Sequence, residues 1–140
     1  MLAGTSPHGS SYSPALWGPM WEAVPSPAVG LEFDPSHLVW QGVDWMAALY
    51  EHGSRVVAFH AKDTEINQYK LEKDGNLMPG WWRYRIPGWG DVDWRQIFKA
   101  LLDLGYKGDM IIEHEDPVFS GDRREEGLKL GLAELHSHAL

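Results

Sequence analysis

The chain has 140 residues, a net charge of −8 and a hydrophobic fraction of 44%, which allows one globular domain with a modest core. It contains no cysteine, so disulfides, thiolate metal ligands and cysteine nucleophiles are excluded. The acidic charge without a local basic patch argues against a nucleic-acid partner. No apolar run approaches the roughly 20 residues of a membrane span, and no signal-peptide pattern is present. We therefore expect a cytoplasmic protein with no membrane partner.

The first 28 residues are predicted to form a leader with little regular structure. Residues 1–13 are rich in Ser, Gly and Pro and are expected to have no helix or strand of their own. Ser13 and Pro14 then open a short predicted helix that contains Trp17, Met20 and Trp21. We place the start of the domain proper at residue 29 and its end at residue 140.

From residue 29 the hydrophobic pattern alternates between strands and helices. Strands are predicted over residues 29–33, 55–59 and 109–112. Helices are predicted over residues 44–50 and onward from Asp93 and Asp122. Asp93 followed by Gln96 is typical of a helix start, and Gly105 suits the residue that ends that helix. The long polar and aromatic segment from Ala61 to Gly90 is assigned no element.

Strands that are separated by helices predict an α/β fold with parallel pairing. Consecutive strands joined by a helix run in the same direction, so the helices must pack on the sheet that the strands form. In such folds the functional side chains gather at the carboxyl ends of the strands.

Carboxylates and histidines follow each of the three predicted strands. They occur as the clusters Asp34-Pro-Ser-His37, His60-Ala-Lys-Asp63 and Glu113-His-Glu115-Asp116. Because side chains alternate along a strand, Glu113 and Glu115 share one face. Asp, His and Glu together suit a divalent ion such as Mn, Zn, Co or Mg. We therefore predict one metal site that is formed by Asp34, His60 and Glu113, with Glu115 as the alternative to Glu113.

Simpler interpretations remain open for single residues. Asp34 alone fits a turn or a helix cap, and His60 alone fits a hydrogen-bonded histidine inside the domain. Lys62 and Asp63 follow His60 and are predicted either to orient a ligand or to lie in a solvated turn.

The aromatic segment before residue 90 offers candidates for substrate binding. Arg85 could bind a phosphate or carboxylate, although a surface arginine is an equally good interpretation. Trp89 could stack on a sugar, whereas large aromatic residues in a loop more often pack the loop against its domain. We predict Arg85 and Trp89 as substrate-binding residues.

Five strings of residues resemble those of a known family. They are Gly30-Leu-Glu-Phe-Asp34-Pro-Ser-His37-Leu, Phe59-His60-Ala-Lys-Asp63, Pro87-Gly-Trp-Gly-Asp-Val-Asp-Trp94, Gly105-Tyr-Lys-Gly and Ile112-Glu113-His-Glu115-Asp116. Together they resemble the sugar phosphate isomerase/epimerase family, which belongs with the type IV apurinic endonucleases to the xylose isomerase-like barrels. The resemblance implies a partial (β/α)8 TIM barrel, of which this chain has the last three βα units.

The resemblance also implies roles for the clustered residues. In this family a divalent metal is held by a Glu, an Asp, a His and a second Glu from four successive strands, and Asp34, His60 and Glu113 match the last three. His37 matches a histidine that contacts the substrate, while Glu115 and Asp63 are expected to support the ligands. Glu113 would also be catalytic, as one of two glutamates that exchange a proton with a keto-sugar through an enediolate.

The first glutamate of that set has no counterpart before residue 29. We therefore expect a metal-dependent isomerase or epimerase of a sugar, a sugar phosphate or a related polyol or keto-sugar, present as an inactive fragment. Its partners would be a second copy of the chain, in a homo-oligomer, or the missing N-terminal half of the barrel, because an incomplete barrel leaves an exposed edge.

Two alternatives belong to other classes. One is a non-enzymatic barrel remnant or assembly subunit that binds a metal or a partner. The other is an apurinic endonuclease, which the sequence disfavours. Those relatives carry an Asp-x-His ahead of a Gly-x-Gly, whereas this chain has Trp82-Arg-Tyr84 ahead of Gly88-Trp-Gly90.

Overall fold

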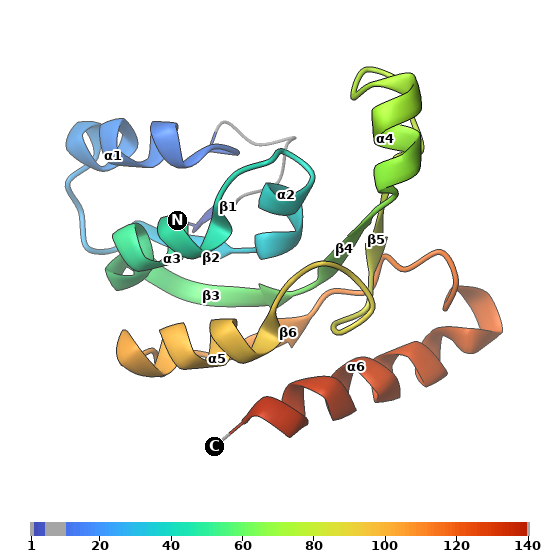
Figure 1. Ribbon diagram of the computed structural model, residues 1–140. Coiled ribbons are helices and arrows are strands. Elements are labelled where there is room, and N and C mark those ends of the chain that lie inside the picture. Colours follow the sequence, from blue (N-terminus) through green and yellow to red (C-terminus); the bar gives the residue numbers. More distant parts are fainter. Residues whose placement is uncertain (1, 5–10, 140) are drawn as a thin grey trace.

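A four-stranded parallel sheet forms the centre of the protein, with strand order β1-β2-β3-β6 (Figure 1). The computed structural model describes residues 2–4 and 11–139. The strands are β1 Leu2–Gly4, β2 Gly30–Phe33, β3 Val56–Ala61 and β6 Met110–Ile112. The predicted α/β fold with parallel strands is therefore confirmed, and the sheet is open.

Strand β1 corrects the prediction that residues 1–13 have no element of their own. It pairs with β2 in a register that runs from Leu2 beside Gly30 to Gly4 beside Glu32. Its sequence, Leu-Ala-Gly, has no β-branched or aromatic residue, so the strand signal is weak. The edge of β2 supplies the pairing that the local sequence does not predict. The other three strands lie within two residues of their predicted positions.

Helices follow the strands, largely as expected. They are α1 Pro14–Ala23, α2 Pro35–Val39, α3 Trp45–His52, α4 Gln68–Asp74, α5 Trp94–Asp103 and α6 Arg124–His138, with single 3-10 turns η1 at Gly53–Arg55 and η2 at Gly121–Arg123. The Asp93 side chain accepts from the Gln96 amide at 3.0 Å, and Gly105 has a φ of 67°, which confirms both predicted helix signals. None of the helices in the described ranges has the length and apolarity to span a membrane.

One face of the sheet is buried against the helices. The Phe33 and Phe59 rings are register neighbours, fully buried, and stacked with centroids 5.5 Å apart. Trp17 of α1 packs edge-on against Phe33, and Ile97 of α5 joins the same core. Each such side chain stabilises the fold by roughly 1.5–3 kcal/mol. The helical layer therefore fixes the position and direction of β2 and β3.

The opposite face of the sheet is uncovered. Val57 on the inner strand β3 is 52% exposed, and Ile111 on the edge strand β6 is 50% exposed. Near the carboxyl ends the same face carries polar side chains, which form the candidate site described below.

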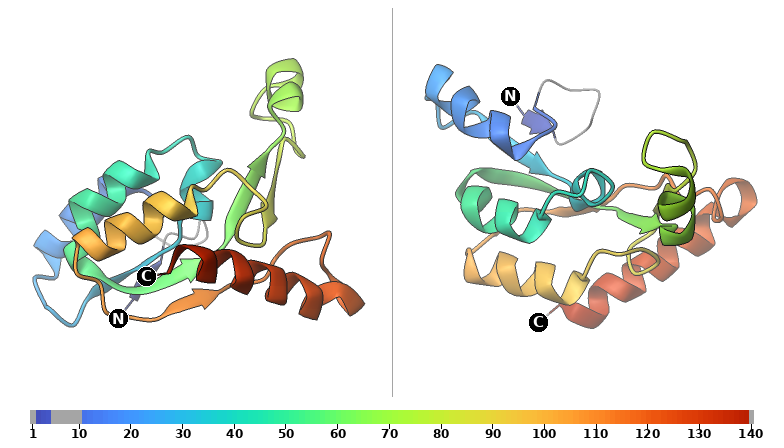
Figure 2. Two further views of the ribbon diagram at one scale, coloured as in Figure 1. Left: turned by 60° about the horizontal axis from the view of Figure 1, so that its bottom comes forward. Right: turned by 45° about the horizontal axis from the view of Figure 1, so that its top comes forward.

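The segment that was assigned no element contains a second, antiparallel sheet. Strands β4 Asp63–Ile66 and β5 Trp82–Arg85 pair from Asp63 with Arg85 to Ile66 with Trp82. Figures 1 and 2 show this ribbon leaving the carboxyl end of β3, with α4 at its far end. The sequence did not predict it because no tight turn joins the two short strands; helix α4 and a loop separate them.

Candidate metal and substrate site

Asp34 lies directly after β2, and its two carboxylate oxygens have different neighbours. Its Oδ1 accepts from the Ser36 amide at 2.8 Å and so caps α2. Its Oδ2 lies 3.4 Å from His37 Nε2. The helix-cap interpretation and the ligand interpretation are therefore compatible, because the cap uses only one oxygen.

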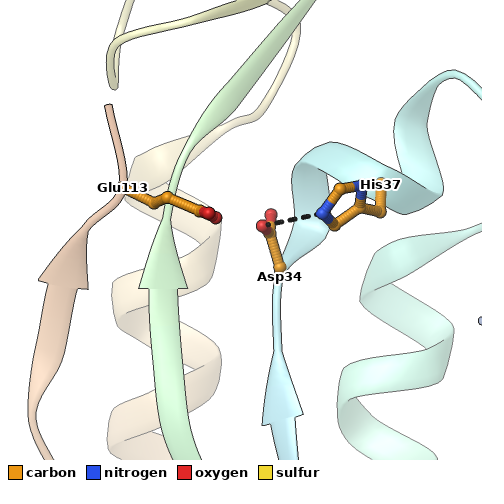
Figure 3. A group of neighbouring side chains, drawn as sticks. All are labelled: Asp34, His37 and Glu113. Atoms are coloured by element: carbon orange, nitrogen blue, oxygen red, sulfur yellow. Dashed lines mark ion pairs between the residues drawn. The ribbon is translucent and has the colours of Figure 1, made fainter. Parts of the chain in front are cut away.

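Three side chains from different elements converge beyond the end of β3. Asp34 follows β2, Glu113 follows β6 and His37 lies in α2. One ligand atom from each lies within 4.8 Å of the others. Figure 3 shows Asp34 and Glu113 pointing toward one another from the two strands that flank β3. This convergence places the candidate site at the carboxyl ends of parallel strands.

Lys62 lies in the middle of this group. Its Nζ is 2.6 Å from Glu113 Oε2, 2.7 Å from Glu115 Oε2 and 3.3 Å from Asp34 Oδ2. The residue is only 1% exposed, so the interpretation of Lys62 as part of a solvated turn is wrong. The sequence does indicate this position of Lys62, because Lys62 continues the alternation of Ala58 and His60 along one face of the strand.

The charges of these groups depend on burial and on one another. Burial raises the pKa of Asp34 to about 6, although Lys62 acts in the opposite direction. Burial also opposes ionisation of Glu113, but Lys62 and His60 outweigh it and hold the pKa of Glu113 below its usual range. Burial alone would lower the pKa of Lys62, yet the surrounding carboxylates raise it above its ordinary value. Lys62 is therefore a charged ammonium at neutral pH.

His60 lies beside the three-residue group and not within it. Its Nδ1 is 3.3 Å from Glu113 Oε2, and its Nε2 is 3.6 Å from Glu32 Oε2. Its role as a metal ligand stays a prediction. Glu32 was not singled out from the sequence, although it shares a strand face with Asp34 by simple alternation.

Tyr84 of β5 orients His37. The Tyr84 hydroxyl lies 2.8 Å from His37 Nδ1, and the two rings meet edge-on. The other imidazole nitrogen, Nε2, is thereby turned toward Asp34 and Lys62. A hydrogen bond of this kind fixes the orientation of a ligating histidine. Tyr84 was noted in the sequence only as a residue that replaces an endonuclease ligand.

The structure does not bring Asp63 to the ligand group. Its carboxylate accepts from the backbone amides of Thr64, Gly88 and Val92 at 2.8–3.1 Å and from the Trp94 indole at 3.0 Å. Asp63 is fully buried and braces the segment that leads into α5, so the solvated-turn interpretation is wrong for it as well. Its predicted support of the metal ligands stays untested.

Arg85 and Trp89, which were predicted to bind substrate, lie against the segment after β6. Arg85 is 6% exposed, so the interpretation of Arg85 as a surface arginine is wrong. Its Nε donates to Asp116 Oδ2 at 2.9 Å, and its guanidinium also pairs with Glu65. Trp89 lies under the Arg85 guanidinium and packs edge-on against Phe119. Two carboxylates balance the charge of Arg85. The substrate roles of Arg85 and Trp89 stay predictions.

The donor set suits a divalent ion. Two carboxylates and one imidazole are oxygen and nitrogen ligands of the kind that Mn, Zn, Co and Mg accept to different degrees. Their oxygens and nitrogen already surround a positive charge, because Lys62 Nζ lies among them. Asp34, His37 and Glu113 are thus the described residues placed to hold such an ion, with His60 adjacent.

Comparison with known proteins identifies the family. Residues 4–138 match the family described as the xylose isomerase-like TIM barrel. The chain belongs to this family. It is 34% identical over 119 residues to the uncharacterized protein YfiH of Bacillus subtilis strain 168, which covers 78% of this chain and 38% of that protein. It is 35% identical over 99 residues to the inosose dehydratase of Clostridium perfringens, covering 66% of this chain and 33% of that enzyme.

Solved structures show the same fold. A xylose isomerase domain protein from Planctomyces limnophilus superimposes with a TM-score of 0.75 at 24% identity, over 98% of this chain and 45% of that one. The 3-keto-D-glucoside 4-epimerase YcjR from E. coli gives a TM-score of 0.52 at 16% identity, over 78% of this chain and 34% of that one. The chain thus spans between about a third and a half of the length of these relatives, and it has the fold of part of a TIM barrel.

Proposed function

We propose that this chain carries one half of a metal-dependent active site that moves a proton next to the carbonyl of a sugar or keto-polyol. The observation that carries the proposal is the convergence of Asp34, His37 and Glu113 at the carboxyl ends of the strands. A bound divalent ion would supply polarisation of the substrate carbonyl and of a neighbouring hydroxyl.

The residues of this chain have separate tasks in the proposed reaction. Asp34 and Glu113 hold the ion together with an imidazole, for which His37 and His60 are the two candidates. Glu113 also exchanges a proton with the substrate carbon, since its carboxylate is the more exposed of the two, with 39% of its side chain accessible against 3% for Asp34. Tyr84 fixes the ring of His37 through the 2.8 Å contact.

Two outcomes follow from the same first step. Removal of a proton next to a carbonyl leads to isomerisation or epimerisation when a proton returns to a different face or carbon. It leads to dehydration when a neighbouring hydroxyl leaves instead. The relatives include both an inosose dehydratase and a 4-epimerase, so we propose the shared proton transfer and leave the product to experiment.

The proposed reaction uses a second glutamate, which the family pattern places on the strand before β2. Strand β1 lies next to β2 in the sheet, and its sequence, Leu-Ala-Gly, contains no carboxylate. The uncovered sheet face, with exposed Val57 and Ile111, also needs further strands to become the interior of a barrel. We therefore propose that the chain alone has little or no activity and that the remaining strands must be supplied to it.

A complementation experiment tests this function. The chain is mixed with a separately produced N-terminal segment of the C. perfringens inosose dehydratase, in the presence of Mn²⁺. Exchange of solvent deuterium into keto-sugars and keto-polyols is then followed by NMR. We expect exchange in the mixture, none with either part alone, and none when the chain carries Glu113→Gln. Rapid exchange by the chain alone would refute the proposed incompleteness, and exchange that survives Glu113→Gln would refute the role of Glu113.

A further inference from the structure

We propose that the Lys62 ammonium is the resident cation of the carboxylate cluster, that a divalent ion displaces it, and that it then remains paired with Glu115. This inference rests on the metal site of the proposed function and adds a competition within it.

The geometry forbids both cations from occupying their preferred positions together. An ion bound to Asp34 Oδ2 and Glu113 Oε2 would lie about 2.0–2.2 Å from each oxygen. Lys62 Nζ already lies 3.3 Å and 2.6 Å from these same two atoms. An ammonium and a divalent ion that share the same oxygens repel one another strongly in a partly buried site. Lys62 must therefore move when the ion enters.

Glu115 and Tyr84 offer the displaced ammonium a second position. Glu115 Oε2 is 2.7 Å from Lys62 Nζ, and Glu115 is not a member of the three-residue ligand group. The Tyr84 ring centroid lies 4.4 Å from Nζ, which is a favourable cation–π distance. A lysine has a flexible four-carbon stem, so a small rotation can exchange the Asp34 and Glu113 contacts for Glu115 alone.

Competition between Lys62 and the ion predicts opposite changes in Mn²⁺ affinity for substitutions of Lys62 and of Glu115. Lys62→Met removes the competing charge, so we expect at least tenfold tighter Mn²⁺ binding together with a lower melting temperature without metal. Glu115→Gln removes the carboxylate that would pair with the displaced Lys62 ammonium, so we expect Mn²⁺ binding to weaken severalfold. Lys107→Met is the matched control, because Lys107 is exposed and the substitution changes the net charge equally.

Calorimetric titration of the metal-free chain and its variants with MnCl₂ tests the inference, with circular dichroism to verify folding. Tighter binding in Lys62→Met but not in Lys107→Met supports it. If wild type binds Mn²⁺ and Lys62→Met binds equally or more weakly, the inference fails while the metal site stands. If no variant binds Mn²⁺, both the inference and the metal dependence of the proposed function fail. Should Lys62→Met not fold without metal, Lys62→Gln is titrated instead, with the same outcomes.

Discussion

Neighbouring carboxylates in the same strand-end strings belong to two different regions of the molecule. Glu113 and Glu115 face the candidate site and contact the Lys62 ammonium. Asp116 comes one residue after Glu115, yet it accepts hydrogen bonds from Ile86, Val118 and Arg85. Asp63 follows Lys62 directly and likewise faces away from the site. The side-chain alternation of an extended chain separates the two groups.

The two regions also differ in the kind of donor that they contain. Asp63 accepts from three backbone amides and one indole, which are neutral donors fixed by the fold. Glu113 and Glu115 contact the Lys62 ammonium at the end of a flexible stem, and Glu113 also contacts an imidazole. Donors that the fold holds in place, including the buried Arg85 guanidinium beside Asp116, make a brace, whereas a carboxylate held by a displaceable cation keeps the capacity to bind another one.

The largest effect on stability is expected from Asp63→Ala. The substitution leaves four donors without their acceptor, three of them in buried residues, and each buried donor costs about 1–3 kcal/mol. We expect the free energy of unfolding to fall by roughly 4 kcal/mol or more, as measured by urea denaturation. The control is Asp122→Ala, at an exposed position in η2, which should change stability by less than about 0.5 kcal/mol. A comparable loss in both variants would contradict the brace.

Breaking the Arg85–Asp116 pair should have the next largest effect. Both side chains are buried, and removal of one member of a buried ion pair costs about 3 kcal/mol. Arg85→Met should therefore destabilise the protein by about that amount in urea denaturation. Arg83→Met is the matched control, because Arg83 pairs with the same Glu65 from an exposed position. A smaller loss for Arg85→Met than for Arg83→Met would show that the pair does not brace the fold.

Asp34→Asn should stabilise the metal-free protein at neutral pH, whereas the substitutions of Asp63 and Arg85 destabilise it. Burial raises the pKa of Asp34 to about 6 from an ordinary value of 3.8, so the folded state favours the protonated form. The stability that the Asp34 carboxyl contributes is therefore fully present below pH 4 and is lost as the pH rises through about 6. Asparagine mimics the neutral form and should add about 3 kcal/mol at pH 8.

The stability that Asp34→Asn adds should vanish below pH 4, and measurements of the free energy of unfolding at several pH values will test this. Asp93→Asn is the control, with an expected stability change of the opposite sign. Hydrogen bonds that Asp93 accepts from Gln96 hold the pKa of Asp93 below its usual range. This variant should lose stability at pH 8, and the loss should shrink as the pH falls. A gain for Asp34→Asn that does not depend on pH would contradict the argument from burial.

Glu115→Gln should have the smallest effect on stability. Its side chain is 48% exposed and its charged partner Lys62 keeps Glu113, so we expect a change below about 1 kcal/mol. Thermal unfolding of this variant beside Asp116→Asn compares two adjacent carboxylates directly. Equal destabilisation would mean that the distinction between site and brace is wrong.

The sequence was sufficient to predict the fold class and most of its elements. Alternating hydrophobic runs and helix caps such as Asp93 placed three strands and their helices. It did not reveal β1 or the β4–β5 ribbon, because those short strands depend on pairing with distant residues. Long-range pairing leaves little trace in a local pattern.

The convergence of Asp34 and Glu113 at the candidate site was predictable from the sequence, but the balance of charge there was not. Asp34 and Glu113 follow strands, so their convergence could be expected from parallel topology. The sequence predicts that His37 contacts the substrate, which stays a prediction, and the structure places its imidazole among the side chains that could hold an ion. The sequence allows two interpretations of Lys62, since periodicity alone does not say whether a strand continues beyond its apolar run. Tyr84 belongs to the ribbon that the sequence did not predict.

Calorimetric titration with Mn²⁺ tests most directly the claim that the strand-end cluster is a metal site. We predict one ion per chain in wild type and in Asp122→Ala, and loss of binding in Asp34→Ala and Glu113→Ala, each verified as folded. His37→Ala and His60→Ala, titrated beside them, will show which imidazole completes the ligand set. Unchanged Mn²⁺ affinity in both Asp34→Ala and Glu113→Ala would contradict the metal site.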